Sequence, residues 1–206
     1  MVEAPDISGA PDAEDLKNFV IASAVTGLAF AAFYNDFNLQ GLAFYALGAG
    51  LIIFSHELGI RAAINQLDAY VDLEVSSSGS TTTLFGAIIS VVTGLAVILP
   101  FPIYNEVTRK QYENWGKSTD VIWARYEFYV SAFAIVALLL SWLAAYSLSF
   151  NTLAQMYAIF TFFQMLPFDY SGIPTGPLDG AYIIRWSGFY WLLFTGLSIL
   201  GIVLTI

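Results

Sequence analysis

The sequence predicts an all-α integral membrane bundle with about five transmembrane helices, one re-entrant hairpin and a short β element. The first observation behind this prediction is composition, because 58% of the 206 residues are hydrophobic and 11% are charged, whereas soluble domains average about 25% charged residues. The second is a series of apolar runs, each near the ~20 residues that a helix needs to cross a bilayer. The third is one short segment in which polar and apolar residues alternate, as they do in a strand.

The first segment, residues 1–16, is expected to be an acidic, solvated tail. It is rich in Pro, Asp and Ala and lacks the basic region that begins a signal peptide. The remaining residues, 17–206, are few enough to form a single transmembrane domain. The net charge of −9 is unfavourable for binding nucleic acid or anionic lipid. The lipid bilayer is the expected environment because of the apolar composition. An acidic balance with few lysines is also compatible with a salt-loving archaeal source.

The apolar runs give the expected crossings, and a polar turn at residues 35–38 separates the first two. In chain order the expected spans are Phe19–Phe37, Leu39–Arg61, Phe128–Leu148, Leu153–Phe168 and Phe189–Ile206. The absence of cysteine excludes disulfides and thiolate metal sites.

A strand is predicted directly after the second span. In Tyr70–Val75 the side chains of Val71, Leu73 and Val75 fall on one face, whereas Tyr70, Asp72 and Glu74 fall on the other. The polar run that follows, residues 76–83, has the composition of a loop.

The apolar stretch Leu84–Leu99 can either cross the membrane or dip into it and return. It carries two glycines and is followed by Pro100 and Pro102, which favour an extended backbone. If it crosses, the seven Lys and Arg residues divide five to two between the two sides; if it returns, all seven lie on one side. Basic residues concentrate on cytoplasmic loops, so we expect a re-entrant hairpin in a multi-pass protein of the cell membrane. The N-terminus is then cytoplasmic and the C-terminus outside.

His56 and Glu57 lie near the inner end of the second span, and His56 is the sole histidine of the chain. Ionisable residues inside a membrane span mark a functional site by default. Two zinc-binding histidines on a helix are normally four residues apart, with a glutamate after the first. The residue four positions after His56 is Ile60, so the pattern of a metal site is present without its second histidine.

Phe54-Ser55-His56-Glu57-Leu58-Gly59 is followed by the strand-like stretch, and later by Gln164-Met165-Leu166-Pro167 and Pro177-Leu178-Asp179-Gly180. In this order and in membrane segments, these features resemble the site-2 protease family of intramembrane zinc metalloproteases. That family carries His-Glu-x-x-His on one helix and Asn-x-x-Pro with Leu-Asp-Gly on another. The resemblance extends from Leu39 to the C-terminus. Gln164 replaces the family's asparagine, and the link between the two later motifs is longer than usual.

By resemblance, His56 and Asp179 correspond to zinc ligands and Glu57 to the general base that activates a zinc-bound water. A catalytic zinc site has three protein ligands plus water, and the side chain of Ile60 offers no lone pair. An active zinc-dependent intramembrane endopeptidase therefore needs a substitute third ligand, for which the sequence offers Asp72, Glu74 or Asp169. Without one, the resemblance implies a degenerate site and no cofactor. The residues that would line the site are Arg61, Gln164, Pro167, Pro177, Leu178 and Gly180.

The same residues have roles that need no metal. His56 can hydrogen-bond Asp179 across the bundle, and Glu57 can pair with Arg61 one helical turn later. Asp179 can also cap the turn that follows it.

The favoured hypothesis is a pseudoprotease that binds the transmembrane segment of another membrane protein or serves as a subunit of a membrane complex. By resemblance, the expected partner-binding element is the strand of Tyr70, Val71, Asp72, Leu73, Glu74 and Val75, onto which an unwound segment can add as a further strand. The active endopeptidase stays as an alternative. A small channel or carrier is a third possibility, for which the sequence offers scattered buried charge and no repeat.

Overall fold

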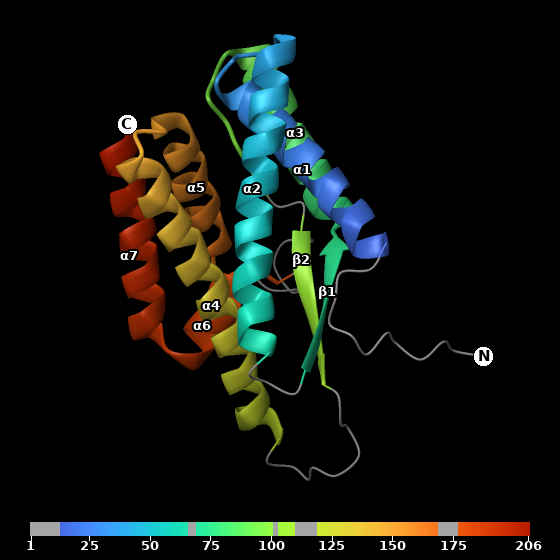
Figure 1. Ribbon diagram of the computed structural model, residues 1–206, viewed down its shortest axis with the longest axis vertical. Helices are drawn as coiled ribbons and strands as arrows, with labels where there is room; N and C mark the ends of the chain where they lie inside the picture. Colours follow the sequence, from blue (N-terminus) through green and yellow to red (C-terminus); the bar gives the residue numbers. More distant parts are fainter. Residues whose placement is uncertain (1–12, 66–68, 101–102, 110–118, 169–176) are drawn as a thin grey trace, which may run out of the picture.

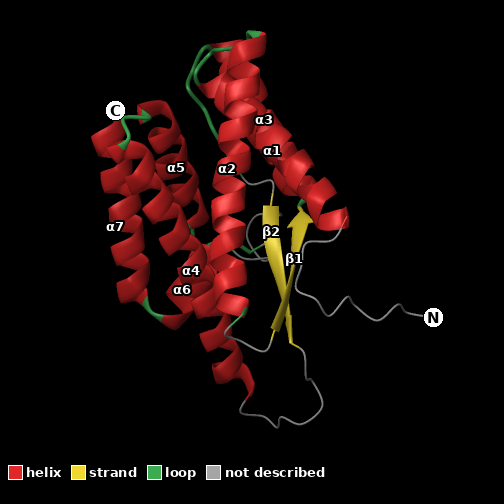
Figure 2. Ribbon diagram, viewed as in Figure 1, coloured by secondary structure: helices red, strands yellow, loops and turns green. Residues whose placement is uncertain are grey.

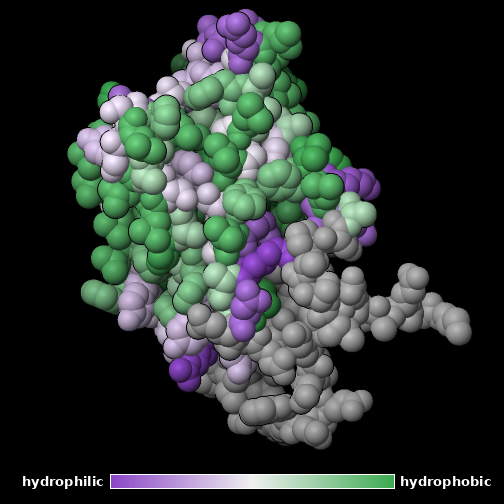
Figure 3. Space-filling view, in the orientation of Figure 1, coloured by the Kyte–Doolittle hydropathy of each residue, from purple (hydrophilic) through white to green (hydrophobic). Residues whose placement is uncertain are grey.

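The computed structural model describes residues 13–65, 69–100, 103–109, 119–168 and 177–206, which contain seven helices and two strands. Four of the helices are long and apolar enough to cross a membrane: α1 (Ala13–Phe33), α2 (Leu39–Ile64), residues Ala124–Ser147 of α4 (Thr119–Ser147), and α7 (Gly188–Thr205). The chain is therefore a helical bundle of a multi-pass membrane protein. Apolar side chains cover much of the face shown in Figure 3, as a lipid-embedded surface requires.

Two groups of helices make up the bundle (Figure 1). In the first, α1 and α2 run antiparallel, and α3 (Ser77–Thr93) packs along α1. In the second, α4 packs against both α5 (Asn151–Gln164) and the short α6 (Asp179–Trp186), while α7 packs against α5. Contacts between α2 and α4 join the two groups.

Local sequence explains the tight pairing of α1 with α2. Asn35 takes the left-handed conformation, with φ of 54°, directly after α1 in the connecting turn. The side chain of Asn38 then accepts a hydrogen bond of 2.7 Å from the amide of Gly41 and caps α2. Within the pair, a Cβ on Gly27 would lie 2.5 Å from the Cα of Ala46, so only glycine permits this closeness between the two backbones.

The strands β1 (Ala69–Val75) and β2 (Ile103–Arg109) form an antiparallel two-stranded sheet beside α1 and α2 (Figure 2). β1 contains the segment Tyr70–Val75, for which alternation in the sequence predicts a strand. The register pairs Val75 with Ile103. The end of β1, where the chain continues into α3, therefore lies beside the start of β2, where the chain returns to the sheet.

The expectation of a loop at residues 76–83 was wrong, because these residues begin α3. Ser76 caps the helix by accepting a hydrogen bond of 2.9 Å from the amide of Gly79. Hydroxyl groups of the first turns then donate to carbonyls four residues earlier, as Thr83 does to Gly79. The hydroxyls of Thr81, Thr82 and Thr83 are thus satisfied locally, and a helix can form from residues that usually favour loops.

Further boundaries differ from the sequence-based expectations, among them the start of α4 at Thr119 instead of Phe128. α1 begins at Ala13, so the last four residues of the expected tail belong to a helix; residues 1–12 lie outside the described part of the chain. The expected span Leu153–Phe168 corresponds to α5, which has 14 residues and ends at Gln164. β2 was not predicted at all, because its residues were assigned to the hairpin and to the loop after it.

Candidate functional site

His56 and Asp179 meet inside the bundle, although 123 positions separate them in the sequence. The imidazole Nε2 lies 2.7 Å from Oδ2 of Asp179, and the two residues are 2% and 8% exposed. The ring of Phe160 on α5 stands edge-on to the imidazole, with 6.3 Å between ring centroids. The contact thus joins the C-terminal third of α2 to the Leu-Asp-Gly motif, as the non-metal interpretation of these residues expects.

Asp179 is held in place by the way that its motif packs on the end of α5. A Cβ on Gly180 would overlap the carbonyl group of Met165 and lie 2.7 Å from the carbonyl oxygen of Leu166. The amide of Leu178 also donates to the carbonyl of Phe168 over 3.0 Å. The two later parts of the family-like pattern are therefore in direct contact.

Asp179 does not cap α6. Leu178 occupies the N-cap position, and Asp179 is the first residue of the helix. Its carboxylate is directed to His56, and a negative charge in the first turn of a helix is also favoured by the helix dipole.

The other residues expected to line the site differ in burial. Gln164, Pro177, Leu178 and Gly180 are buried, whereas Pro167 is exposed. The indole of Trp191 on α7 donates a hydrogen bond of 2.8 Å to the carbonyl of Met165. This bond fixes the end of α5 against which the Leu-Asp-Gly motif is seated.

Glu57 is a buried carboxylate, 7% exposed. Within the described part of the chain, neither of its oxygens has a hydrogen-bond partner. Nε of Arg61 lies 3.8 Å from Oε2 of Glu57, and Nδ1 of His56 lies 3.8 Å from Oε1. Arg61 makes a shorter contact with Asp15 of α1, at 2.8 Å. The expected Glu57–Arg61 pair is therefore present at 3.8 Å, and Asp15 is the closer anion for the guanidinium.

Ile60 is fully buried in a small apolar cluster between α2 and α4 that also contains Ala63, Val130 and Ala134. The preceding Gly59 allows this close packing, since a Cβ there would lie 2.5 Å from the carbonyl oxygen of Phe133. At the position of the family's second histidine this chain thus has the apolar side chain of Ile60, which packs against apolar residues of α4.

The described residues do not fit a catalytic zinc ion. Among them, no group of three His, Cys, Asp or Glu side chains is placed to hold a metal, whereas catalytic zinc takes three protein ligands. Of the possible substitutes, Asp169 lies outside the described residues, and Asp72 and Glu74 are described in their backbone alone. His56 and Asp179 form a buried polar contact through Nε2 of the imidazole, and Nδ1 of His56 has no hydrogen-bond partner in the described part of the chain.

The structure also connects β1 to α1, which the sequence did not indicate. Oδ1 of Asp15 accepts a hydrogen bond of 3.1 Å from the amide of Leu73, and Nδ2 of Asn18 donates one of 2.9 Å to the carbonyl of Leu73. Asp15 was assigned to the solvated tail, and Asn18 lies between that tail and the first expected span, which starts at Phe19. Neither position carries a motif that marks this contact.

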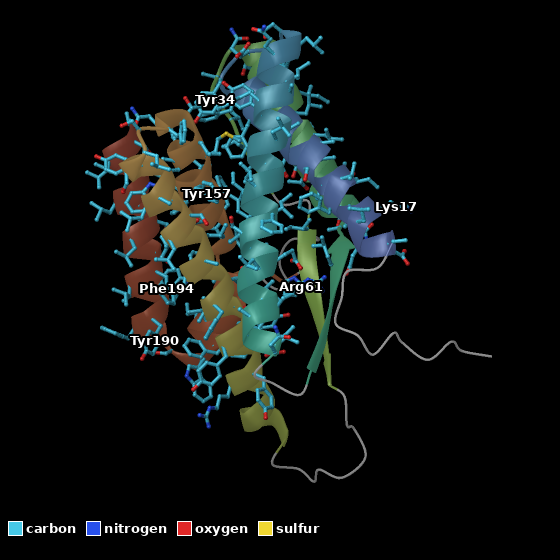
Figure 4. The ribbon with its side chains drawn as sticks, in the orientation of Figure 1. Lys17, Tyr34, Arg61, Tyr157, Tyr190 and Phe194 are labelled. Atoms are coloured by element: carbon cyan, nitrogen blue, oxygen red, sulfur yellow. The ribbon has the colours of Figure 1, made fainter. Side chains whose placement is uncertain are left out.

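A second buried polar cluster was also missed. The hydroxyls of Ser55 and Tyr157 lie 2.9 Å apart, and Ser141 donates to Ser55 over 3.1 Å. These residues come from α2, α5 and α4, so the cluster ties three helices together one position from His56. Hydrogen bonds of this kind stabilise helix association in a membrane. The phenol of Tyr157 lies between α5 and α2 (Figure 4).

Comparison with protein-family models, with curated proteins and with solved structures finds no match to this chain.

Proposed function

We propose that this chain is a site-2-protease-like membrane protein that has lost the catalytic zinc site and holds the transmembrane segment of another membrane protein. It would act as a pseudoprotease, as a binding protein or as a subunit of a membrane complex. The His56–Asp179 contact at 2.7 Å is the observation that carries the proposal. It unites the two motifs on which the resemblance rests, at a depth where an ionisable pair is costly to maintain.

The packing around Ile60 supports loss of catalysis rather than a simple change of ligand. Ile60 contacts Val130 and Ala134 of α4 in an apolar cluster, so the surroundings as well as the ligand differ from what a zinc site needs. Glu57 stays buried, and its carboxylate lies 3.8 Å from the guanidinium of Arg61. The chemistry left at this site is hydrogen bonding and charge pairing.

The sheet supplies the means of holding a partner. A two-stranded sheet has two outer edges, and an extended segment can add to such an edge through main-chain hydrogen bonds. β1 lies against α1 and α2, next to the helix that carries His56 and Glu57. A partner helix that unwinds locally could therefore pair with the sheet while its helical parts stay in the bilayer.

We further propose five crossings, with α5 included, and a re-entrant hairpin formed by α3 and the segment after it. The direction of the chain supports this topology, since α4 and α7 run the same way in Figure 1 and α5 returns between them. α5 is shorter than a full span, and the non-helical backbone of residues 166–168 that follows it is tolerable in a bilayer where protein covers it. The pairing of Val75 with Ile103 supports a hairpin that enters and leaves on the same side. The N-terminus is then cytoplasmic and the C-terminus outside.

A site-directed photo-cross-linker in native membranes tests the partner role. The cross-linking residue is placed at Val75 in β1, with Leu192 on α7, which is 65% exposed, as a matched control that faces lipid. We expect a discrete adduct with another membrane protein from position 75 and none from position 192. Equal adducts from both positions, or none from position 75, would contradict the proposal.

A further inference from the structure

The beginning of α1 lies along the outer edge of β1, the edge that faces away from β2. Asp15 and Asn18 of α1 reach one residue of that strand, Leu73. Leu73 stands opposite Asn105 in the register of the sheet, yet both of its main-chain groups bond to α1. The peptide groups of Leu73 therefore point outward from the sheet, where a third strand would lie.

The two side chains reproduce what a neighbouring strand would offer. In an antiparallel sheet, two residues of a hydrogen-bonded pair exchange both bonds, so that each supplies one carbonyl oxygen and one N–H group. Here Oδ1 of Asp15 takes the place of the carbonyl, accepting from the Leu73 amide over 3.1 Å. The carboxamide of Asn18 takes the place of the N–H, donating to the Leu73 carbonyl over 2.9 Å.

Arg61 holds this arrangement to α2. Its guanidinium bonds the other oxygen of Asp15, Oδ2, over 2.8 Å, and its side chain is 22% exposed. The same guanidinium lies 3.8 Å from Glu57. If Asp15 moved away, Arg61 would keep a carboxylate beside it, so release of α1 would leave no isolated charge in the bundle.

We propose that the first turns of α1 are a displaceable substitute for a third strand, and that they occupy the position at Leu73 where an extended segment of the partner pairs with β1. This inference rests on the proposed function, and it adds the position at which the partner pairs, Leu73, and the element that blocks that position, α1. The ligand is recognised by its backbone, a carbonyl and an N–H of one residue in extended conformation. Exchange of α1 for such a segment replaces the two hydrogen bonds to Leu73 with two others, and it also breaks the contact between Asp15 and Arg61.

The first test measures hydrogen exchange at the Leu73 amide in the full-length protein in detergent. The Asp15→Ala/Asn18→Ala double variant removes both side-chain partners, and Asp15→Asn keeps an acceptor oxygen while it removes the charge. Lys17→Ala changes an exposed residue of the same turns (Figure 4) and serves as control. We expect exchange in the double variant to be faster by about tenfold, the effect of losing one hydrogen bond, with Asp15→Asn in between and Lys17→Ala unchanged. Unchanged exchange in both Asp15 variants would overturn the inference and leave the proposed function standing.

The second test uses a fluorescent synthetic copy of β2, residues 103–109, as the probe strand. A copy with N-methylated backbone amides, which is unable to pair, is the control peptide. We expect the probe to bind the double variant at least about tenfold more tightly than the unaltered protein, and the N-methylated copy to bind neither. The inference would be overturned if the probe bound the double variant and the unaltered protein equally while the N-methylated copy bound neither. The probe would then pair at another edge, such as that of β2. Binding to neither, with faster exchange in the variant, would overturn strand pairing at β1 itself, and with it the corresponding part of the proposed function.

Discussion

The hydrogen bond between His56 and Asp179 should behave as a coupled, buried pair without a metal. Both residues are buried, and their contact distance is 2.7 Å. Removing one partner of a buried pair typically costs about 3–5 kcal/mol, whereas replacing both with apolar groups is often neutral. His56→Leu leaves the carboxylate of Asp179 buried alone, so we expect it to lower the free energy of unfolding by about 3 kcal/mol. Asp179→Ala leaves an imidazole that can stay neutral, and about 1–3 kcal/mol is expected.

The assay is reversible unfolding in mixed micelles by titration with a denaturing detergent. The double variant His56→Leu/Asp179→Ala should be more stable than the sum of the single effects predicts, by about 1–3 kcal/mol of coupling energy. A chelator should leave the stability of the unaltered protein unchanged. If the single effects simply add, within about 0.5 kcal/mol, the two residues do not stabilise each other, and the argument for a metal-free pair fails.

Three further predictions concern the site and the topology. Ile60→His should fail to create zinc binding, measured by metal analysis after dialysis, because the new imidazole would face an apolar cluster; stoichiometric zinc would mean that the lost ligand is the whole defect. Gly180→Ala should reduce the free energy of unfolding by at least about 2 kcal/mol, since its methyl group would overlap the backbone at the end of α5, and an unchanged denaturation midpoint would refute this packing. Single cysteines at Thr82 and Lys117 should both be shielded from an impermeant label applied outside the cell, while a cysteine at Asn151 is labelled. Labelling of one of the first two positions alone would restore a full crossing between them.

The sequence predicts those parts of the fold that depend on composition over a long stretch. Apolar runs predict the four long helices, because a bilayer imposes both length and hydrophobicity on any helix that crosses it. Alternation predicts the strand at Tyr70–Val75, since its side chains face two different environments. The order of two motifs suggests that His56 and Asp179 belong together, and the structure brings them into contact.

The remaining features depend on contacts that local composition does not encode. Residues 76–83 resemble a loop in composition, yet the hydroxyls of Thr81, Thr82 and Thr83 bond within the helix that they form. β2 has no clean apolar face, and its pairing with β1 brings together segments about thirty residues apart, a nonlocal contact. Asp15 belongs to an acidic stretch that is typical of a tail, and its role is defined by Leu73 and Arg61, which lie far along the chain.

The metal content of the protein tests the central claim most directly. The protein is purified in detergent without added zinc or chelator, beside the Asp179→Ala variant, and zinc is measured per chain. A membrane protein that has kept the site-2-protease-like scaffold and lost its metal site should contain no zinc in either form. Near-stoichiometric zinc that disappears in the variant would contradict the account and would indicate a working metal site whose third ligand has yet to be found.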